Sequence, residues 1–451
     1  MTHALSDSSI RVAVVGGGLA GCECAYRLAR AGVLVTLFEM KPHHFSPAHS
    51  EDGLAELVCS NSFRSDQPDS AVGLLKAEMR SLDSLTMQVA QTTRVPAGKA
   101  LAVDRERFSR EITRIMESTP GITLERKEIP SLDASELNGY TAIVIAAGPL
   151  ASESLGASLA QAVDATQLYF YDAIAPIISA DSVDMSVAFW GSRYQPEDND
   201  YLNCPMSRDE YFAFHAALLA GEKAPTRNFE KEIHFEGCMP IEAMAERGEM
   251  TLAFGPFKPV GFTDPRTGER PFALVQLRAE DLNKSMFNLV GCQTKLKYGE
   301  QDRIFRMIPG LEHAEFVRYG SVHRNTYVNA PRVLNGDLSL KTRPDIFLAG
   351  QITGVEGYVE SAACGLWVGI LLAARLTGRG ETPPPPPETC FGGLLRHLQT
   401  EQKNFQPANV QFGLMPELGM RAKKKDRKLL YANRAQERFA DWLASARDRL
   451  A

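Results

Sequence analysis

The sequence lacks long apolar runs, paired cysteines and a strong excess of one charge. No run of about 18 or more apolar residues occurs, so we expect no membrane span. The N-terminus has no basic stretch followed by an apolar one, so we expect no signal peptide. The eight cysteines are scattered and form no CxxC pair, which argues against a zinc site and a disulfide framework. These absences predict a cytoplasmic protein without a metal.

Composition is ordinary for a globular protein, with 44% hydrophobic and 23% charged residues. At 451 residues the chain is too long for one core and predicts two or three domains. The net charge of −6 means that any contact with nucleic acid must come from a local basic patch. The sequence does not indicate an oligomeric state.

The best candidate for such a patch is the tail segment RAKKKDRK (421–428), which follows a polyproline spacer at 383–387. A charge run of this kind is often only the solvated face of a helix. Because the chain as a whole is acidic, this basic segment is the best candidate for a contact with the phosphate backbone of a nucleic acid.

The segment 10–40 carries the most specific motif. A short β-branched run leads into glycines with G-x-G-x-x-G spacing, then a helical pattern, then a second strand that ends in an acidic residue. The glycines allow a tight turn, close approach of a pyrophosphate and packing of helix on strand. The helix N-terminus offers free N–H groups to phosphates, and the acid can accept from ribose hydroxyls. The predicted dinucleotide-binding residues are Gly16, Gly17, Gly18, Leu19, Ala20, Gly21 and Glu39.

Two later stretches favour FAD over NAD as the dinucleotide. Residues 140–149 read as a buried strand that ends in a glycine turn. Residues 344–376 read as a strand, a glycine-rich loop and a long apolar helix. We predict that Gly350, Gly354 and Gly357 bring this loop close to the flavin, by analogy with two-domain flavoproteins.

A cofactor site divided between the two ends of the chain implies an insertion between them. We predict an α/β fold with a Rossmann-like FAD-binding domain and a parallel sheet, interrupted by an α+β insertion domain. The expected limits are 1–165 and 315–451 for the FAD-binding domain, and 166–314 for the insertion.

One cysteine has an unusual context. Cys59 lies in AELVCSNS (55–62), between an apolar run and three small polar residues. On its own it would be read as a small buried residue, because free cysteine usually behaves as one. Its alternative role is that of a reactive thiol.

Long blocks of the sequence resemble the folate- and FAD-dependent tRNA (uracil-5-)-methyltransferases of bacteria, and the resemblance covers nearly the whole chain. The blocks are PAHS (47–50), AELVCSNS (55–62), AVGLLKAEMR (71–80), VPAGKALAVDR (95–105), DYLNCPM (200–206), FEGCMPIE (235–242), FGPFKPVG (254–261), ALVQLR (273–278), HRNTYVNAP (323–331) and GVEGYVESAACG (354–365).

The resemblance implies formation of 5-methyluridine in the T-loop of tRNA. The carbon would come from 5,10-methylenetetrahydrofolate and the electrons from reduced FAD, which NADH or NADPH would regenerate. Because C5 of uracil is a poor nucleophile, a thiolate must first add to C6, and a base must later remove the C5 proton.

The resemblance also assigns roles to residues. Cys238 would attack C6, and Cys59 would assist as a base or thiol partner. His323 would stack on the pterin, although a histidine of the protein core explains this position equally well. Arg324 and Asn325 could contact folate or flavin.

Three classes of function stay open at this point. They are the tRNA methyltransferase, including the same chemistry on ribosomal RNA; an FAD oxidoreductase of a small molecule; and a flavin-bound RNA-binding protein without catalysis.

Overall fold

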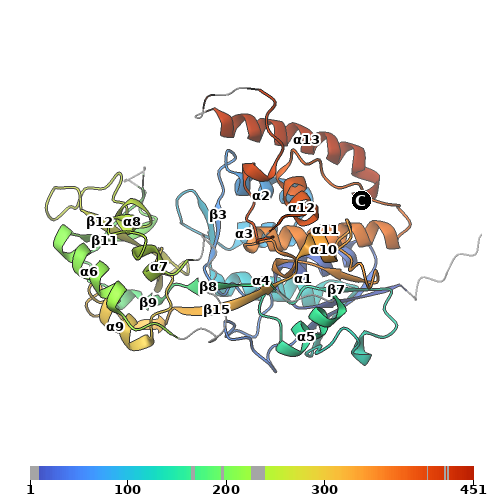
Figure 1. Ribbon diagram of the computed structural model, residues 1–451, viewed down its shortest axis with the longest axis horizontal. Coiled ribbons are helices and arrows are strands. Elements are labelled where there is room, and N and C mark those ends of the chain that lie inside the picture. The colour runs from blue at the N-terminus through green and yellow to red at the C-terminus, as the bar shows by residue number, and fades with distance from the viewer. Residues whose placement is uncertain are drawn as a thin grey trace, which may run out of the picture.

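A computed structural model describes residues 10–163, 168–193, 198–224, 239–403, 405–420, 423 and 426–450. Figure 1 shows two bodies, a larger one that contains both ends of the described chain and a smaller one at the left. A long two-stranded ribbon joins them. The predicted α/β architecture with an inserted mixed domain is confirmed.

The larger body is organised around a five-stranded parallel sheet in the order β16-β7-β1-β2-β6. Its central strand β1 reads RVAVV and is buried in all but its first residue. Such a nearly continuous apolar run is typical of a parallel strand covered by helices on both faces. The strands are β1 (Arg11–Val15), β2 (Leu34–Glu39), β6 (Ile122–Arg126), β7 (Ala142–Ile145) and β16 (Ile346–Leu348).

Helices α1 (Leu19–Arg30) and α11 (Tyr358–Leu376) pack closely against each other. Glycines on α11 make this possible, because a Cβ on Gly365 would lie 2.0 Å from the carbonyl oxygen of Ala20. The apolar composition of α11 would also suit a membrane span, but 83% of its apolar window is buried inside the protein. We interpret it as the central helix of the core.

Further helices surround this pair. Their bounds are α2 (Ala71–Ser81), α3 (Leu85–Thr92), α4 (Arg105–Ser118), α5 (Glu153–Ala162), α10 (Ala330–Val333), α12 (Cys390–Gln399) and α13 (Arg427–Leu450). The last helix, α13, packs on α2 and α11. Trp442 of α13 donates a hydrogen bond to the carbonyl oxygen of Pro383, so the tail helix is fastened to the proline spacer.

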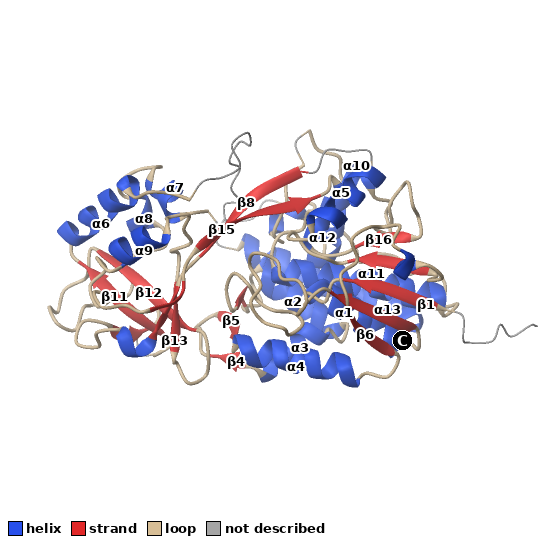
Figure 2. Cartoon of the chain, turned by 90° about the horizontal axis from the view of Figure 1, so that it is seen from below, coloured by secondary structure: helices blue, strands red, loops and turns tan. Residues whose placement is uncertain are grey.

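The smaller body is a six-stranded sheet in the order β10-β11-β12-β13-β9-β14, with antiparallel pairing throughout. Figure 2 shows its helices gathered on one side of the sheet. The elements are β9 (Ile177–Ser179), β10 (Phe189–Gly191), β11 (Tyr201–Met206), α6 (Arg208–Ala220), α7 (Ile241–Ala245), α8 (Thr251–Phe254), β12 (Ala273–Ala279), β13 (Met286–Leu289), α9 (Tyr298–Phe305) and β14 (Phe316–Arg318). The domain limits at 166 and 314 stay a prediction.

Two structures connect the bodies. The ribbon pairs β8 (Leu168–Ile174) with β15 (Ser321–Tyr327), and its register sets His323 opposite Asp172. A small sheet of β3 (Ser62–Ser65), β5 (Ala100–Val103) and β4 (Arg94–Val95) lies against the insertion. There the side chain of Asn61 donates to the carbonyl oxygens of Val103 and Ala279, at 2.9 and 3.0 Å, and so fixes the two bodies to each other.

Candidate functional site

The first glycine-rich loop leaves the carboxyl end of β1 and enters α1. Gly16 has φ 108°, a backbone conformation that side chains rarely adopt, and it makes the turn. A Cβ on Gly21 would lie 1.9 Å from the carbonyl oxygen of Gly16, so Gly21 allows the helix to pack on the turn. A Cβ on Gly18 would meet nothing within 4 Å. Gly18 therefore faces open space at the N-terminus of α1, where a phosphate can approach the backbone.

Glu39 ends β2 beside this loop and is 7% exposed. Its Oε2 accepts a hydrogen bond of 2.7 Å from the backbone N–H of Gly17, and its Oε1 accepts one of 2.9 Å from the backbone N–H of Lys41. The carboxylate thus holds the glycine loop in place. Each oxygen keeps a second lone pair, so Glu39 can also accept from a ribose hydroxyl.

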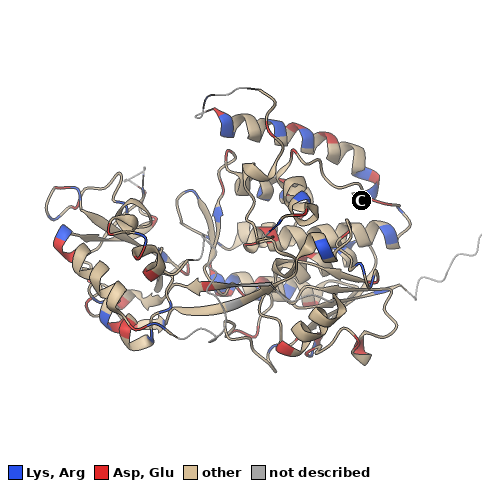
Figure 3. Ribbon diagram, in the orientation of Figure 1, with Lys and Arg blue, Asp and Glu red and all other residues tan. Residues whose placement is uncertain are grey.

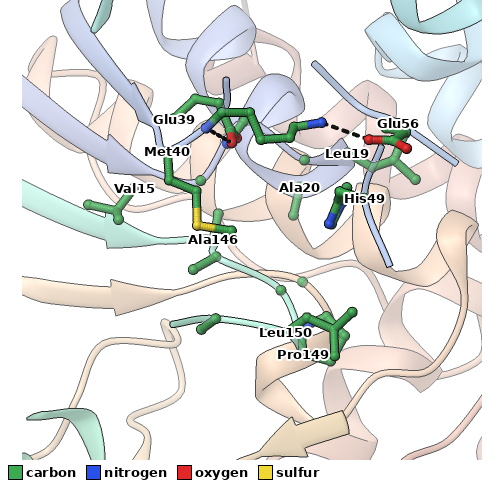
Figure 4. A pocket seen from close by; sticks show the side chains of 18 of the residues that line it. Val15, Leu19, Ala20, Glu39, Met40, His49, Glu56, Ala146, Pro149 and Leu150 are labelled. Atoms are coloured by element: carbon green, nitrogen blue, oxygen red, sulfur yellow. Dashed lines mark hydrogen bonds and ion pairs between the residues drawn. The ribbon is translucent and has the colours of Figure 1, made fainter. Parts of the chain in front are cut away.

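The loop opens into a pocket with about 1110 Å³ of empty space, part of it open to solvent (Figure 4). Gly16, Gly17, Gly18, Leu19, Ala20, Glu39 and Gly350 of the predicted residues line it. Figure 4 shows Glu39 and Met40 on one side of the pocket and Pro149 and Leu150 on another. A mostly apolar pocket whose wall includes a glycine-rich loop able to hold phosphates suits a dinucleotide.

The second glycine-rich loop contributes less directly than expected. Gly350 lines the pocket, and a Cβ there would lie 2.8 Å from the Cβ of Ala20. Gly354 and Gly357 do not line it. A Cβ on Gly354 would collide with the ring of Phe405, and one on Gly357 would lie 2.6 Å from Oε2 of Glu360. These two glycines shape the loop, and their contact with a cofactor stays a prediction.

Cys59 lies where the pocket meets the second loop. Its backbone N–H donates a hydrogen bond of 2.7 Å to the hydroxyl oxygen of Tyr358, the first residue of α11. Tyr358 and Val58 both line the pocket. The segment around Cys59 is therefore attached to the start of α11, beside the pocket.

Exposure distinguishes Cys59 from the other cysteines of the described chain. Cys59 is partly exposed, whereas Cys22, Cys24, Cys204, Cys292, Cys364 and Cys390 are buried. Burial raises the pKa of each of these six thiols, so they stay protonated at neutral pH. Among the described cysteines, only Cys59 is accessible to a reactant.

His323 lies on the ribbon, and its Nε2 is 2.9 Å from the hydroxyl oxygen of Ser321. Burial, helped by the positive charge of Arg318, lowers the pKa of His323 to about 4. The imidazole is therefore neutral at physiological pH and offers a flat ring without a charge.

Several predicted residues fall outside the described part of the chain. Cys238 is one of them, as are Lys424 and Lys425 of the basic segment, and the side chain of Arg324 is also not described. Lys423 is described and exposed. Beyond it, Figure 3 shows both basic and acidic residues along the ribbon of α13.

Sequence reasoning missed three features of the site. Tyr358 belongs to the block GVEGYVESAACG (354–365), but the sequence alone assigns it no role. His49 lines the pocket, and so do Lys41 and Glu56, which form an ion pair. The Nζ atom of Lys41 lies 2.9 Å from Oε2 of Glu56, and both side chains are buried. In the sequence, the ion pair and His49 could have been suspected only from the lysine two positions after Glu39 and from the PAHS block.

Comparison with known proteins agrees with this geometry. A family model described as glucose inhibited division protein A (GIDA) matches residues 11–380. The methylenetetrahydrofolate--tRNA-(uracil-5-)-methyltransferase TrmFO of Oleidesulfovibrio alaskensis is 74% identical over 432 residues, covering 96% of this chain and 97% of that protein. The chain belongs to the TrmFO family. The resemblance inferred from the sequence blocks is confirmed.

More distant relatives agree on family and fold. The TrmFO protein of Myxococcus xanthus is 54% identical over 448 residues, covering 98% of this chain and 96% of that one. A structure of GidA from Aquifex aeolicus superimposes with a TM-score of 0.72 at 17% identity, covering 99% of this chain and 75% of that one. At this identity the likeness establishes the fold that TrmFO proteins share with GidA.

Proposed function

We propose that this protein methylates C5 of a uridine in tRNA, in the T-loop, with 5,10-methylenetetrahydrofolate as the carbon donor. The proposal rests first on the activity for which its TrmFO relatives are named, one of them 74% identical. The structural observation that supports it best is the partly exposed Cys59 at the end of a dinucleotide pocket, hydrogen-bonded through its backbone to Tyr358. The other substrates are tRNA and NADH or NADPH.

FAD is the proposed resident cofactor, and the residues present fit it. Gly16 makes the tight turn, and Gly18 leaves the backbone open at the start of α1, where N–H groups can hold the pyrophosphate. Glu39 would accept from the adenosine ribose, and the walls near Pro149, Gly350 and Tyr358 are available to the rest of the molecule. When bound and reduced, the flavin supplies the two electrons that convert a methylene carbon into a methyl group.

The chemistry on uracil is proposed to belong to two thiols. Addition of the Cys238 thiolate to C6 would turn the ring into an enolate whose C5 attacks the one-carbon unit. The C5 proton must then leave, and elimination of the thiol restores the aromatic ring. Cys59 is the proposed acceptor of that proton, because it is the accessible thiol beside the pocket.

The surrounding residues would position these groups. Tyr358 fixes the backbone of Cys59 and Ser60 through one hydroxyl oxygen, at 2.7 and 3.3 Å. Arg105 contributes from the opposite side, where it donates to the carbonyl oxygen of Leu57 and pairs with Glu280 of the insertion at 2.8 Å. The neutral ring of His323 is the proposed stacking surface for the pterin.

The decisive test is an assay of the purified protein with labelled methylenetetrahydrofolate, NADH or NADPH, and unmodified RNA. We expect label in 5-methyluridine of a tRNA transcript, and none in a tRNA whose T-loop uridine is replaced. Label in a ribosomal RNA transcript alone would move the activity to that substrate. Methylation with S-adenosylmethionine as the only methyl donor would contradict the proposed mechanism.

A further inference from the structure

A second and larger hollow lies between the two bodies. It has about 2330 Å³ of empty space, part of it open to solvent, and its walls come from α4 on one side and from the ends of β9, β13 and β14 on the other. Glu56 lines both this cleft and the dinucleotide pocket, so the two adjoin.

Arg318 lies in the wall of this cleft because of a local irregularity. Phe316 pairs with Ile178 and Arg318 with Ile177, so β14 carries one extra residue, Val317. In a regular strand, residues 316 and 318 would face the same side. With the bulge, Phe316 packs on the apolar core of the insertion while Arg318 faces the cleft together with Ile177.

The guanidinium of Arg318 is not satisfied by the described protein. Its Nε and Nη2 atoms are buried and have no hydrogen-bond partner, and no carboxylate of the described residues forms an ion pair with it. Arg105, on the facing wall, pairs with Glu280 and donates to the carbonyl oxygen of Leu57, although its Nη2 and the Oε1 atom of Glu280 also lack a hydrogen-bond partner. Burial and the positive charge of Arg105 lower the pKa of Arg318, which still stays charged at neutral pH.

The free atoms of Arg318 indicate the kind of ligand. Nε and Nη2 form one edge of the guanidinium, which donates two parallel hydrogen bonds to a carboxylate or phosphate. Eight carboxylate side chains and five guanidinium groups line the cleft, so it repels a long polyanion such as RNA. A small anion that reaches Arg318 individually fits better.

We propose that Arg318 is an anion-binding residue of the cleft, and that its free edge holds an oxyanion of a small co-substrate, namely a carboxylate on the glutamate tail of the folate. The assignment to folate rests on the proposed function. His323, the proposed stacking residue for the pterin, lies on β15 (Ser321–Tyr327), which follows directly after the strand β14 that Arg318 ends. A folate whose pterin stacks on His323 and whose tail runs toward Arg318 would place its glutamate carboxylate at the free edge of the guanidinium.

The test is calorimetric titration of the flavin-loaded protein with three probes: tetrahydrofolate, 6-methyltetrahydropterin, which has no tail, and NADPH. Arg318→Gln should weaken tetrahydrofolate binding about 10- to 100-fold, because a charged bidentate pair is lost, and leave the pterin unchanged. The affinity of Arg318→Lys for tetrahydrofolate should lie between those of the wild type and Arg318→Gln, because lysine keeps the positive charge but cannot donate two parallel hydrogen bonds. Arg107→Gln, an exposed arginine of the same cleft, is the matched control and should change nothing.

Thermal unfolding separates binding from a structural role. Because the buried Nε and Nη2 of Arg318 lack partners in the free protein, Arg318→Met should leave Tm equal or higher, whereas loss of a structural contact would lower it. If Arg318→Gln weakens the binding of NADPH but not of tetrahydrofolate, Arg318 still binds an anion, and that anion is a phosphate of NADPH. Equal loss for tetrahydrofolate and the tail-free pterin, or no loss for any probe, would overturn the inference. Wild-type protein that binds no folate would instead contradict the proposed function.

Discussion

The dinucleotide pocket and the interdomain cleft share a wall at Glu56 but are built in opposite ways. The phosphate cradle of the pocket comes from one continuous stretch, in which strand, glycines, helix and Glu39 follow each other. The cleft is lined by short pieces of chain that lie far apart in the sequence, from Ser50 to Arg318. Local chemistry determines the first, and the packing of two bodies determines the second. Variants can test this difference.

The largest effect is expected in the glycine loop, where two neighbouring glycines do different jobs. Gly21→Val should prevent folding, because its Cβ would lie 1.9 Å from the carbonyl oxygen of Gly16. Gly18→Val should fold normally, since its Cβ meets nothing, but its side chain would occupy the space of the pyrophosphate. Flavin content and circular dichroism of both purified variants measure this. A yellow Gly18→Val protein with full flavin would refute the cofactor assignment.

On the ribbon, the ring of His323 should matter more than its nitrogens. His323→Ala should weaken tetrahydrofolate binding about tenfold by removing a stacking surface, whereas His323→Phe should retain most of the affinity. Because the pKa of His323 is about 4, wild-type affinity should not change between pH 6 and 8 through this group. An equal loss in both variants would return His323 to the role of a core histidine.

The basic segment provides a smaller, salt-dependent effect. Neutralising Lys423, Lys424 and Lys425 removes about three phosphate contacts, so tRNA affinity should fall. The slope of the logarithm of the binding constant against the logarithm of the salt concentration should become less negative by roughly two to three. Binding measured at several salt concentrations gives this slope. An unchanged slope would make the segment a solvated part of the tail.

The smallest effect concerns stability alone, at a site far from both hollows. Glu78 on α2 accepts from the backbone N–H groups of Cys390 and Phe391 at the start of α12, and burial raises its pKa to about 8. The native state therefore keeps a proton that the unfolded chain loses above its ordinary pKa of 4.5. Through this group, the free energy of unfolding should fall as the pH rises from 4.5 to 8, by up to about 1.4 kcal/mol per pH unit. Denaturant unfolding of Glu78→Gln should show a weaker pH slope, and an identical slope would disprove the assignment.

The sequence predicted the parts of this protein that depend on neighbours in the chain. The turn at Gly16, the helix from Leu19 and the buried strand before them follow from residue types and spacing alone. The bond between Cys59 and Tyr358 joins positions 299 apart, and the contact of Asn61 with Ala279 joins positions 218 apart, so no local pattern indicates them. The bulge at Val317 likewise depends on which strand β14 meets. Cys59 could be proposed as a reagent only through family resemblance.

The central claim is that Cys238 and Cys59 both act on uracil, and a trapped covalent adduct tests it most directly. A tRNA with 5-fluorouridine at the target position cannot lose its C5 substituent as a proton. The adduct should therefore persist, and peptide mapping should place it on Cys238. Cys59→Ser should still form it while losing turnover on normal tRNA by roughly 10²- to 10⁴-fold. Cys292→Ala, which removes a buried thiol, should keep both properties. An adduct on Cys59, or one that survives in Cys238→Ser, would contradict the assignment.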